Sequence, residues 1–195
     1  MNVGDIIELA KISALANLSI VKNEAAVIKL IYLGVSELYS SFNLSIKVES
    51  IETHSNLALY ELRDEDVNML LKVYNCKGQQ LEKTDAINEK ADYKIINYRS
   101  FLLNNPREDL LFAVYKASPK MFTSDKDRID LPNAMIDALL SYLGYLAHSA
   151  INTDGVRETS AYLERYELAR QKLENQGYKV SINNESIGLI VKGFI

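Results

Sequence analysis

Few residues of this chain have the type and spacing that catalysis requires. It contains two histidines, His54 and His148, and one cysteine, Cys76. A nucleophile needs a base within hydrogen-bonding reach, and these histidines fall in an expected turn and near an expected helix end. Lys77 beside Cys76 would favour a thiolate, but the sequence offers the thiol no partner. We therefore expect no catalytic residues and a protein that is not an enzyme.

Acidic residues gather in one segment that has part of the spacing of a calcium loop. Asp125, Asp127 and Asp130 lie in Ser-Asp-Lys-Asp-Arg-Ile-Asp. Counted from Asp125, the position that needs glycine holds Asp130, and the position that needs a bidentate acid holds Ile136. We interpret the segment as a solvated loop, and residues 64–66 as a charged turn. Without zinc spacing or a glycine-rich phosphate loop, the sequence predicts no metal site and no cofactor.

The composition excludes other classes. The chain has 195 residues, 48% of them hydrophobic, and a formal net charge of −4. An acidic chain without a basic block is a poor candidate for holding nucleic acid through its phosphates. The longest mostly apolar run, residues 25–42, is broken by Lys29 and Glu37, so we expect no membrane span. Acid near the amino terminus, in place of the basic start of a secretory leader, indicates a cytoplasmic product.

Helical spacing marks the first part of the chain. Residues 5–17 are rich in Ala, Leu and Ile, which predicts a helix that begins near Asp5. A second helix is expected from a cap at Asn23 to Phe42, because apolar residues recur there every three or four positions. Only a narrow polar strip interrupts its surface, so this helix is expected to be buried over most of its circumference.

The middle of the chain has the period of strands. Leu44, Ile46 and Val48 alternate with polar residues, and further strands are expected over 57–62, 67–74, 94–103 and 110–116. On the strand 67–74, one face is expected to carry Val67, Met69, Leu71 and Val73. Short polar connections favour antiparallel pairing. Residues 79–92 fit either a loop or one short helix.

Helical spacing returns after Leu131 and Pro132. A break at 152–155 separates two helices, which should form an antiparallel hairpin that ends at Gly177. Glu167 and Arg170 are expected to form an ion pair three residues apart. The predicted fold class is α+β: a helical bundle of N- and C-terminal helices, a central and mainly antiparallel β insertion, and an extended C-terminal arm. The expected domains are 1–43, 44–128 and 129–177, followed by the arm at 178–195.

The arm is too apolar for a solvated tail. It adds a strand to the protein's own sheet, or it binds another subunit or protein by strand addition or in a groove. Its candidate partner-binding residues are Tyr178, Val180, Ile182, Ile187, Leu189, Val191, Phe194 and Ile195.

The C-terminal part resembles the head-to-tail adaptor, or ring, proteins of tailed phages, particularly the short-tailed type. The residues that carry the resemblance are Ile129-Asp130-Leu131-Pro132, the helix Met135–Leu143, a second helix from Tyr162 to Leu173, and the ending Lys192-Gly193-Phe194-Ile195. It covers about the last 65 residues, and the order helices, strands, helices extends it to the whole chain.

The resemblance implies a structural protein of the virion. Such proteins form a homo-oligomeric ring, typically of twelve subunits, between the portal protein and the tail proteins. Double-stranded DNA passes through the lumen without sequence-specific binding, and an acidic chain suits such a conduit because it does not hold phosphate. The expected location is the head-tail interface of the virion, and the host cytoplasm during assembly.

Two other interpretations stay open. One is a non-viral oligomeric scaffolding or regulatory module whose arm binds a different partner. The other is an enzyme with an acid-based or tyrosine-based site between the sheet and the helices.

Overall fold

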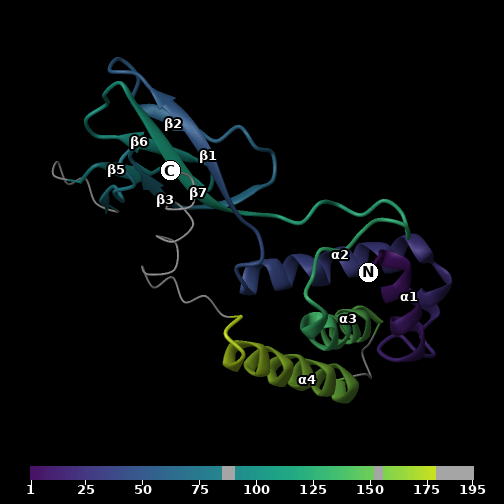
Figure 1. Ribbon diagram of the computed structural model, residues 1–195. Coiled ribbons are helices and arrows are strands. Elements are labelled where there is room, and N and C mark those ends of the chain that lie inside the picture. The colour runs from purple at the N-terminus through teal and green to yellow at the C-terminus, as the bar shows by residue number, and fades with distance from the viewer. Residues whose placement is uncertain (85–90, 152–155, 179–195) are drawn as a thin grey trace. The chain divides into compact units, whose positions relative to one another are not determined.

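In the computed structural model, residues 1–84, 91–151 and 156–178 are described, and they fall into two units (Figure 1). The helical unit combines residues 1–44 with the segment that starts at Pro119, and the β unit contains residues 45–118. The described residues form four α-helices and two sheets whose strands are mostly antiparallel, so the fold is α+β. In the helical unit, the elements are α1 (Val3–Ile12), η1 (Ser19–Lys22), α2 (Glu24–Ser41), η2 (Asn133–Met135), α3 (Ile136–Ile151) and α4 (Val156–Asn175).

Helix α1 begins two residues before the expected range 5–17 and ends five residues before it does. Asn2 caps it: its Oδ1 accepts the Asp5 N–H at 2.8 Å, and the Asp5 carboxylate accepts the Asn2 N–H at 2.7 Å. Asp5 therefore closes a capping box three residues inside the cap. The predicted end at residue 17 is wrong, because the helix stops at Ile12 and Asn17 has a left-handed φ of 66°.

The later helices follow the sequence prediction more closely. Asn23 caps α2 by accepting the Ala26 N–H at 3.2 Å, as expected. Gly177 has a φ of 86°, a left-handed conformation that ends the helical path after α4, as expected. The predicted ion pair is confirmed, with Arg170 Nη1 at 3.5 Å from Glu167 Oε2.

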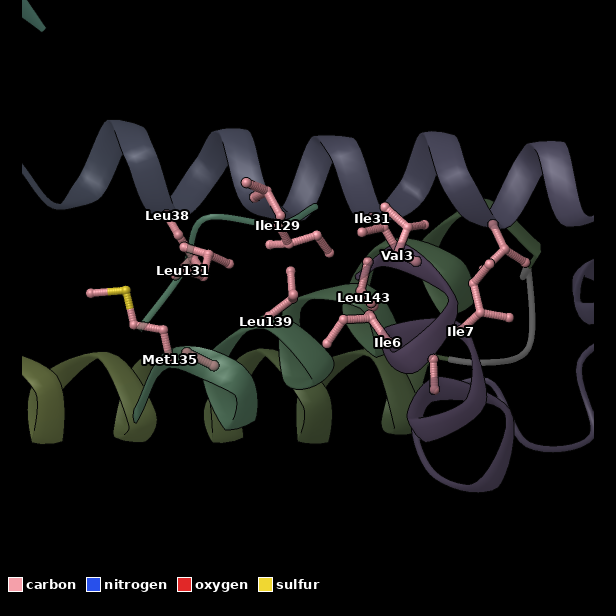
Figure 2. Packing of buried hydrophobic residues seen from close by; sticks show 14 of the residues in the cluster. Val3, Ile6, Ile7, Ile31, Leu38, Ile129, Leu131, Met135, Leu139 and Leu143 are labelled. Atoms are coloured by element: carbon pink, nitrogen blue, oxygen red, sulfur yellow. The ribbon is translucent and has the colours of Figure 1, made fainter. Parts of the chain in front are cut away.

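One hydrophobic core joins these helices (Figure 2). Ile31 and Leu38 of α2 face Leu139 and Leu143 of α3, and α1 adds residues such as Ile6. The connection before η2 takes part, because Ile129 and Leu131 are buried in the same cluster. Helices that precede and helices that follow the β unit in the sequence therefore share one core.

The border between the units differs from the expected end of the β-rich domain at residue 128. Residues 119–128 belong to the helical unit. The Val3 N–H donates to the Asp127 carbonyl at 2.9 Å, and the Gly4 N–H to the Asp125 carbonyl at 2.7 Å. Backbone groups at the start of α1 thus hold this segment. The bonded residues are more than 120 positions apart in the sequence, and no local pattern predicts their contact.

The β unit contains two sheets. The first has the order β1 (Ile46–Thr53), β7 (Asp109–Ala117), β3 (Val67–Tyr74), and both pairings are antiparallel. The second has the order β2 (Leu59–Glu61), β6 (Ser100–Leu103), β5 (Tyr93–Ile95), β4 (Lys83–Thr84), with β4 and β5 parallel. The main β-unit core contains residues of both sheets, among them Tyr115 and Phe101.

Two strand predictions need correction. The single strand expected over 94–103 is a hairpin, β5 and β6, because the Asn97 side chain accepts the N–H groups of Arg99 and Ser100 and turns the chain. Register shifts interrupt β3, so its expected face of Val67, Met69, Leu71 and Val73 is broken. Val67 and Val73 join the core, whereas Met69 is exposed.

A glycine sets the approach of α3 to α4. A Cβ on Gly144 would lie 2.4 Å from Cδ1 of Tyr162, close to the root of that ring. A Cβ on Gly34 would meet Leu139 Cδ1 at 2.7 Å, a terminal methyl that can move.

Gly144→Ala should therefore lower the free energy of unfolding by about 1–3 kcal/mol, because overpacking exceeds the gain in helix propensity. Gly34→Ala is the matched control and should cost less. Urea unfolding followed by circular dichroism measures both. Equal effects of the two substitutions would contradict the close approach at Gly144.

Candidate functional site

The predicted arm is described only at its first residue. Tyr178 is half-buried, packs against the helical core, and its N–H donates to the Leu173 carbonyl at 3.1 Å. The other seven predicted partner-binding residues lie outside the described residues: Val180, Ile182, Ile187, Leu189, Val191, Phe194 and Ile195. Tyr178 thus anchors the point where the arm leaves α4.

Cys76 and His54 belong to the β unit, and His148 belongs to the helical unit. Cys76 is exposed, and a hydrogen bond with Asp109 raises the pKa of its thiol, an effect larger than the opposing one of Lys77. His54 is exposed beside β1. His148, in the other unit, stacks on Tyr162 with 5.1 Å between ring centroids, and its Nδ1 lies 3.9 Å from Glu158 Oε2. These contacts give His148 a packing role between α3 and α4.

The acids that resemble part of a calcium loop bind the chain itself. The Asp127 carboxylate accepts the N–H groups of Thr123 at 2.7 Å and Ser124 at 2.9 Å, and these bonds lower its pKa. The Asp130 carbonyl accepts the Tyr39 hydroxyl at 3.0 Å. Among the described residues, no group of three His, Cys, Asp or Glu side chains is placed to hold a metal ion.

A polar network that sequence reasoning missed ties the turn 64–66 to the first sheet. The Tyr115 hydroxyl, from the central strand β7, donates to Asp64, and Lys47 of β1 pairs with Asp66. Burial, followed by the Asp64 contact, raises the pKa of Tyr115. Tyr115 and Asp64 are 51 positions apart in sequence, and nothing local to either residue announces the contact.

This network holds the loop between β2 and β3. The Arg63 N–H donates to Glu49 of β1, and the Ser118 N–H donates to the Asp66 carbonyl. The carboxylates of Asp64, Asp66 and Glu49 therefore fasten the β2–β3 connection to the first sheet.

The β unit also has a hollow of about 300 Å³. Leu81, Leu103 and Leu111 contribute apolar lining, and polar side chains line the rest. Several of these polar groups already bind the backbone: Asn75 Oδ1 accepts two N–H groups, and the Asp92 carboxylate accepts the Glu82 N–H. Their partners identify them as turn-stabilising groups.

Apolar side chains at the surface are the features best suited to contacts with other proteins. On the helical unit, Ile12 of α1 is 81% exposed and Leu168 of α4 is 59% exposed, and Leu33 of α2 is exposed as well. On the β unit, a separate cluster has Tyr74 and Val114 buried, with the partly buried Ile46, Leu71 and Phe112 packed against them. Its described members come from β1, β3 and β7 alone.

Membrane contact by a spanning helix is not indicated, since the described part of the chain holds no helix that is both long and apolar enough to cross a bilayer.

A search against models of known protein families finds no match, and no curated protein matches the chain in sequence.

Proposed function

We propose that this protein is a non-enzymatic head-to-tail adaptor of a tailed phage, a homo-oligomeric ring that joins the portal protein to the tail proteins. The observation that supports this best is that helices before and after the β unit share one helical core, with the β unit inserted between them in the sequence. The resemblance of residues 129–195 to such adaptors implies that organisation. The expected helical bundle and the extended arm form the remaining parts of the proposal.

The proposed roles follow from the surfaces. Exposed apolar residues on different helices, Ile12, Leu33 and Leu168, offer contacts between neighbouring subunits. The arm, with Val180, Ile182, Ile187, Leu189, Val191, Phe194 and Ile195, is the segment proposed to bind the portal or a neighbouring subunit. The net charge of −4 suits a lumen that lets double-stranded DNA pass without holding it.

Binding to a portal ring tests this function. The test requires a portal protein encoded in the same genome, and the truncated variant ends after Tyr178, which packs on the helical core. We expect the full chain to co-sediment with portal rings, and the variant to lose at least ten-fold in apparent affinity while keeping its helical circular dichroism. A chain with residues 179–195 in scrambled order is the matched control and should also fail.

Each outcome has a separate meaning. Undiminished portal binding by the truncated chain would contradict the role of the arm. Failure of the full chain to bind portal rings, or a genome without portal and tail genes beside this one, would contradict the adaptor function. Self-association without portal binding would favour the scaffolding module.

A further inference from the structure

Among the strands that the structure describes, none pairs with the outer edge of β1, which we call its open edge. The Ala117 N–H donates to the Ser45 carbonyl at 2.9 Å, one step before the pair Ile46↔Lys116, and the register then continues to Thr53 without a shift. Hydrogen-bonded and non-bonded pairs alternate in an antiparallel ladder. The backbone groups of every second residue therefore point away from β7, namely those of Ile46, Val48, Ser50 and Glu52.

These groups have no backbone hydrogen bond to any described residue outside the sheet ladder. The edge of β3 on the opposite side differs, since the Leu70 N–H donates to the Tyr98 carbonyl and the Leu81 N–H to the Val73 carbonyl. An eight-residue edge strand without proline or bulge is a ready template for another strand, and proteins usually cover such an edge.

The side chains beside this edge favour an apolar occupant. Ile46 belongs to the cluster with Phe112 and Val114 on one face of the sheet, and Val48, two positions further on β1, is 38% exposed. An added strand that carries branched aliphatic residues would extend this apolar face.

The chain itself contains such a segment. Ile187, Leu189 and Val191 alternate along a C-terminal stretch that also contains Ile190 and ends at Ile195, a composition that favours strands. In Figure 1, α2 and α4 end on the same side of the helical unit, and β1 begins five residues after α2 ends. Eight residues, 179–186, separate Tyr178 from Ile187 and can span roughly 30 Å, about the length of β1.

We propose that, in the free protein, residues 187–195 bind the open edge of β1 in the same chain. A segment tethered this closely has a high effective concentration, so the chain's own arm is favoured over that of a second copy. The inference concerns the free protein and does not rest on the proposed function. A partner that binds the arm would first have to displace residues 187–195 from β1.

Ser50→Pro tests the edge without touching the β1–β7 ladder. The Ser50 N–H points to the open edge, and proline is tolerated on an edge strand when its missing donor faces outward. Residue-resolved amide hydrogen exchange of the full chain measures the result. We expect slow exchange of the 187–195 amides in the unsubstituted protein and in the control Ser50→Ala, and at least ten-fold faster exchange in Ser50→Pro.

The N–H groups of Lys47, Glu49 and Ile51 point to β7, so faster exchange at these amides would reveal that Ser50→Pro disturbs folding. A second variant covers that case. Replacing Leu189 and Ile190 together with proline leaves the body of the protein unchanged. The outward amides of Ile46, Val48 and Ser50 should then exchange at least ten-fold faster.

Three results would overturn the inference. The first is exchange of the outward β1 amides at the rate of exposed amides in the unsubstituted protein. The second is arm protection that survives Ser50→Pro with the ladder intact. The third is protection that disappears on dilution together with a dimer, because the arm would then be bound to another copy.

Discussion

Leu139→Ala should lower the free energy of unfolding of the helical unit by about 2–5 kcal/mol. Leu139 is fully buried and contacts the position of Gly34 on α2 with its terminal methyl. Figure 2 shows it between α2 and α3, in a core that also takes in Ile129 and Leu131. Truncation of Leu139 leaves a cavity. Residues of α2, of α3 and of the connection before η2 surround it, and a cavity enclosed in this way collapses poorly.

Leu168→Ala is the control for this prediction, because it removes the same atoms from an exposed position on α4. It should change the free energy of unfolding by less than about 0.5 kcal/mol. Urea unfolding, followed by far-ultraviolet circular dichroism at 222 nm, reports on the helices. Similar losses for Leu139→Ala and Leu168→Ala would contradict the assignment of Leu139 to the core.

The elements that sequence reasoning located best are those whose signals are local. Helix α2 has a cap at Asn23 and apolar residues at helical spacing on the same short segment. Strand β3 was placed at its observed ends, but its faces were not, because register shifts against β7 change which side chains point inward. A bulge depends on the partner strand, and the pattern of one strand does not contain that information.

The turn between β5 and β6 had a local sequence signal, but the alternation of apolar and polar residues over 94–103 was interpreted as one continuous strand. Asn97 followed by two residues whose N–H groups it binds is an Asx turn, and asparagine within an expected strand could have been interpreted as a break. The attachment of residues 125–127 to the start of α1 had no comparable signal. Contacts of that kind depend on the assembled core.

The same distinction holds for the candidate sites. The expectation of no catalytic residues came from the scarcity of cysteine and histidine alone. The use of Asp64 and Asp66 as fasteners required the positions of Tyr115 and Lys47. The open edge of β1 required the strand order β1-β7-β3, since an edge is a property of a sheet and a single strand does not define it.

Alkaline pH should destabilise this protein steeply above pH 10. Burial is the first cause of a raised pKa at five tyrosines: Tyr39, Tyr74, Tyr115, Tyr142 and Tyr166. In the unfolded chain each titrates near pH 10. Between that value and the higher pKa of the folded state, the unfolded chain has released a proton that the folded protein still holds. Stability is therefore fully present below pH 10 and falls as pH rises, by up to about 1.4 kcal/mol per pH unit for each tyrosine.

Tyr115 and Tyr166 should contribute most, since both are almost fully buried and their hydroxyls donate to carboxylates, Asp64 and Glu37. Each predicts a loss on the order of 2 kcal/mol between pH 10 and 12 in the free energy of unfolding of its own unit. Urea unfolding at pH 9, 10, 11 and 12 measures it. Tyr115→Phe and Tyr166→Phe should each make the decline shallower, whatever they do to stability at pH 8.

Tyr98→Phe is the matched control, because that residue is 56% exposed. Removal of its hydroxyl should leave the decline unchanged. Burial lowers the pKa of Lys116, so this lysine contributes with the opposite sign: its destabilising effect is relieved as pH rises from that lowered pKa toward the unfolded value. One lysine cannot offset five tyrosines, because each group contributes at most the same slope. A free energy of unfolding that stays constant from pH 9 to 12, or a decline that both phenylalanine substitutions leave intact, would show that these hydroxyls ionise as readily in the folded protein as in the unfolded chain.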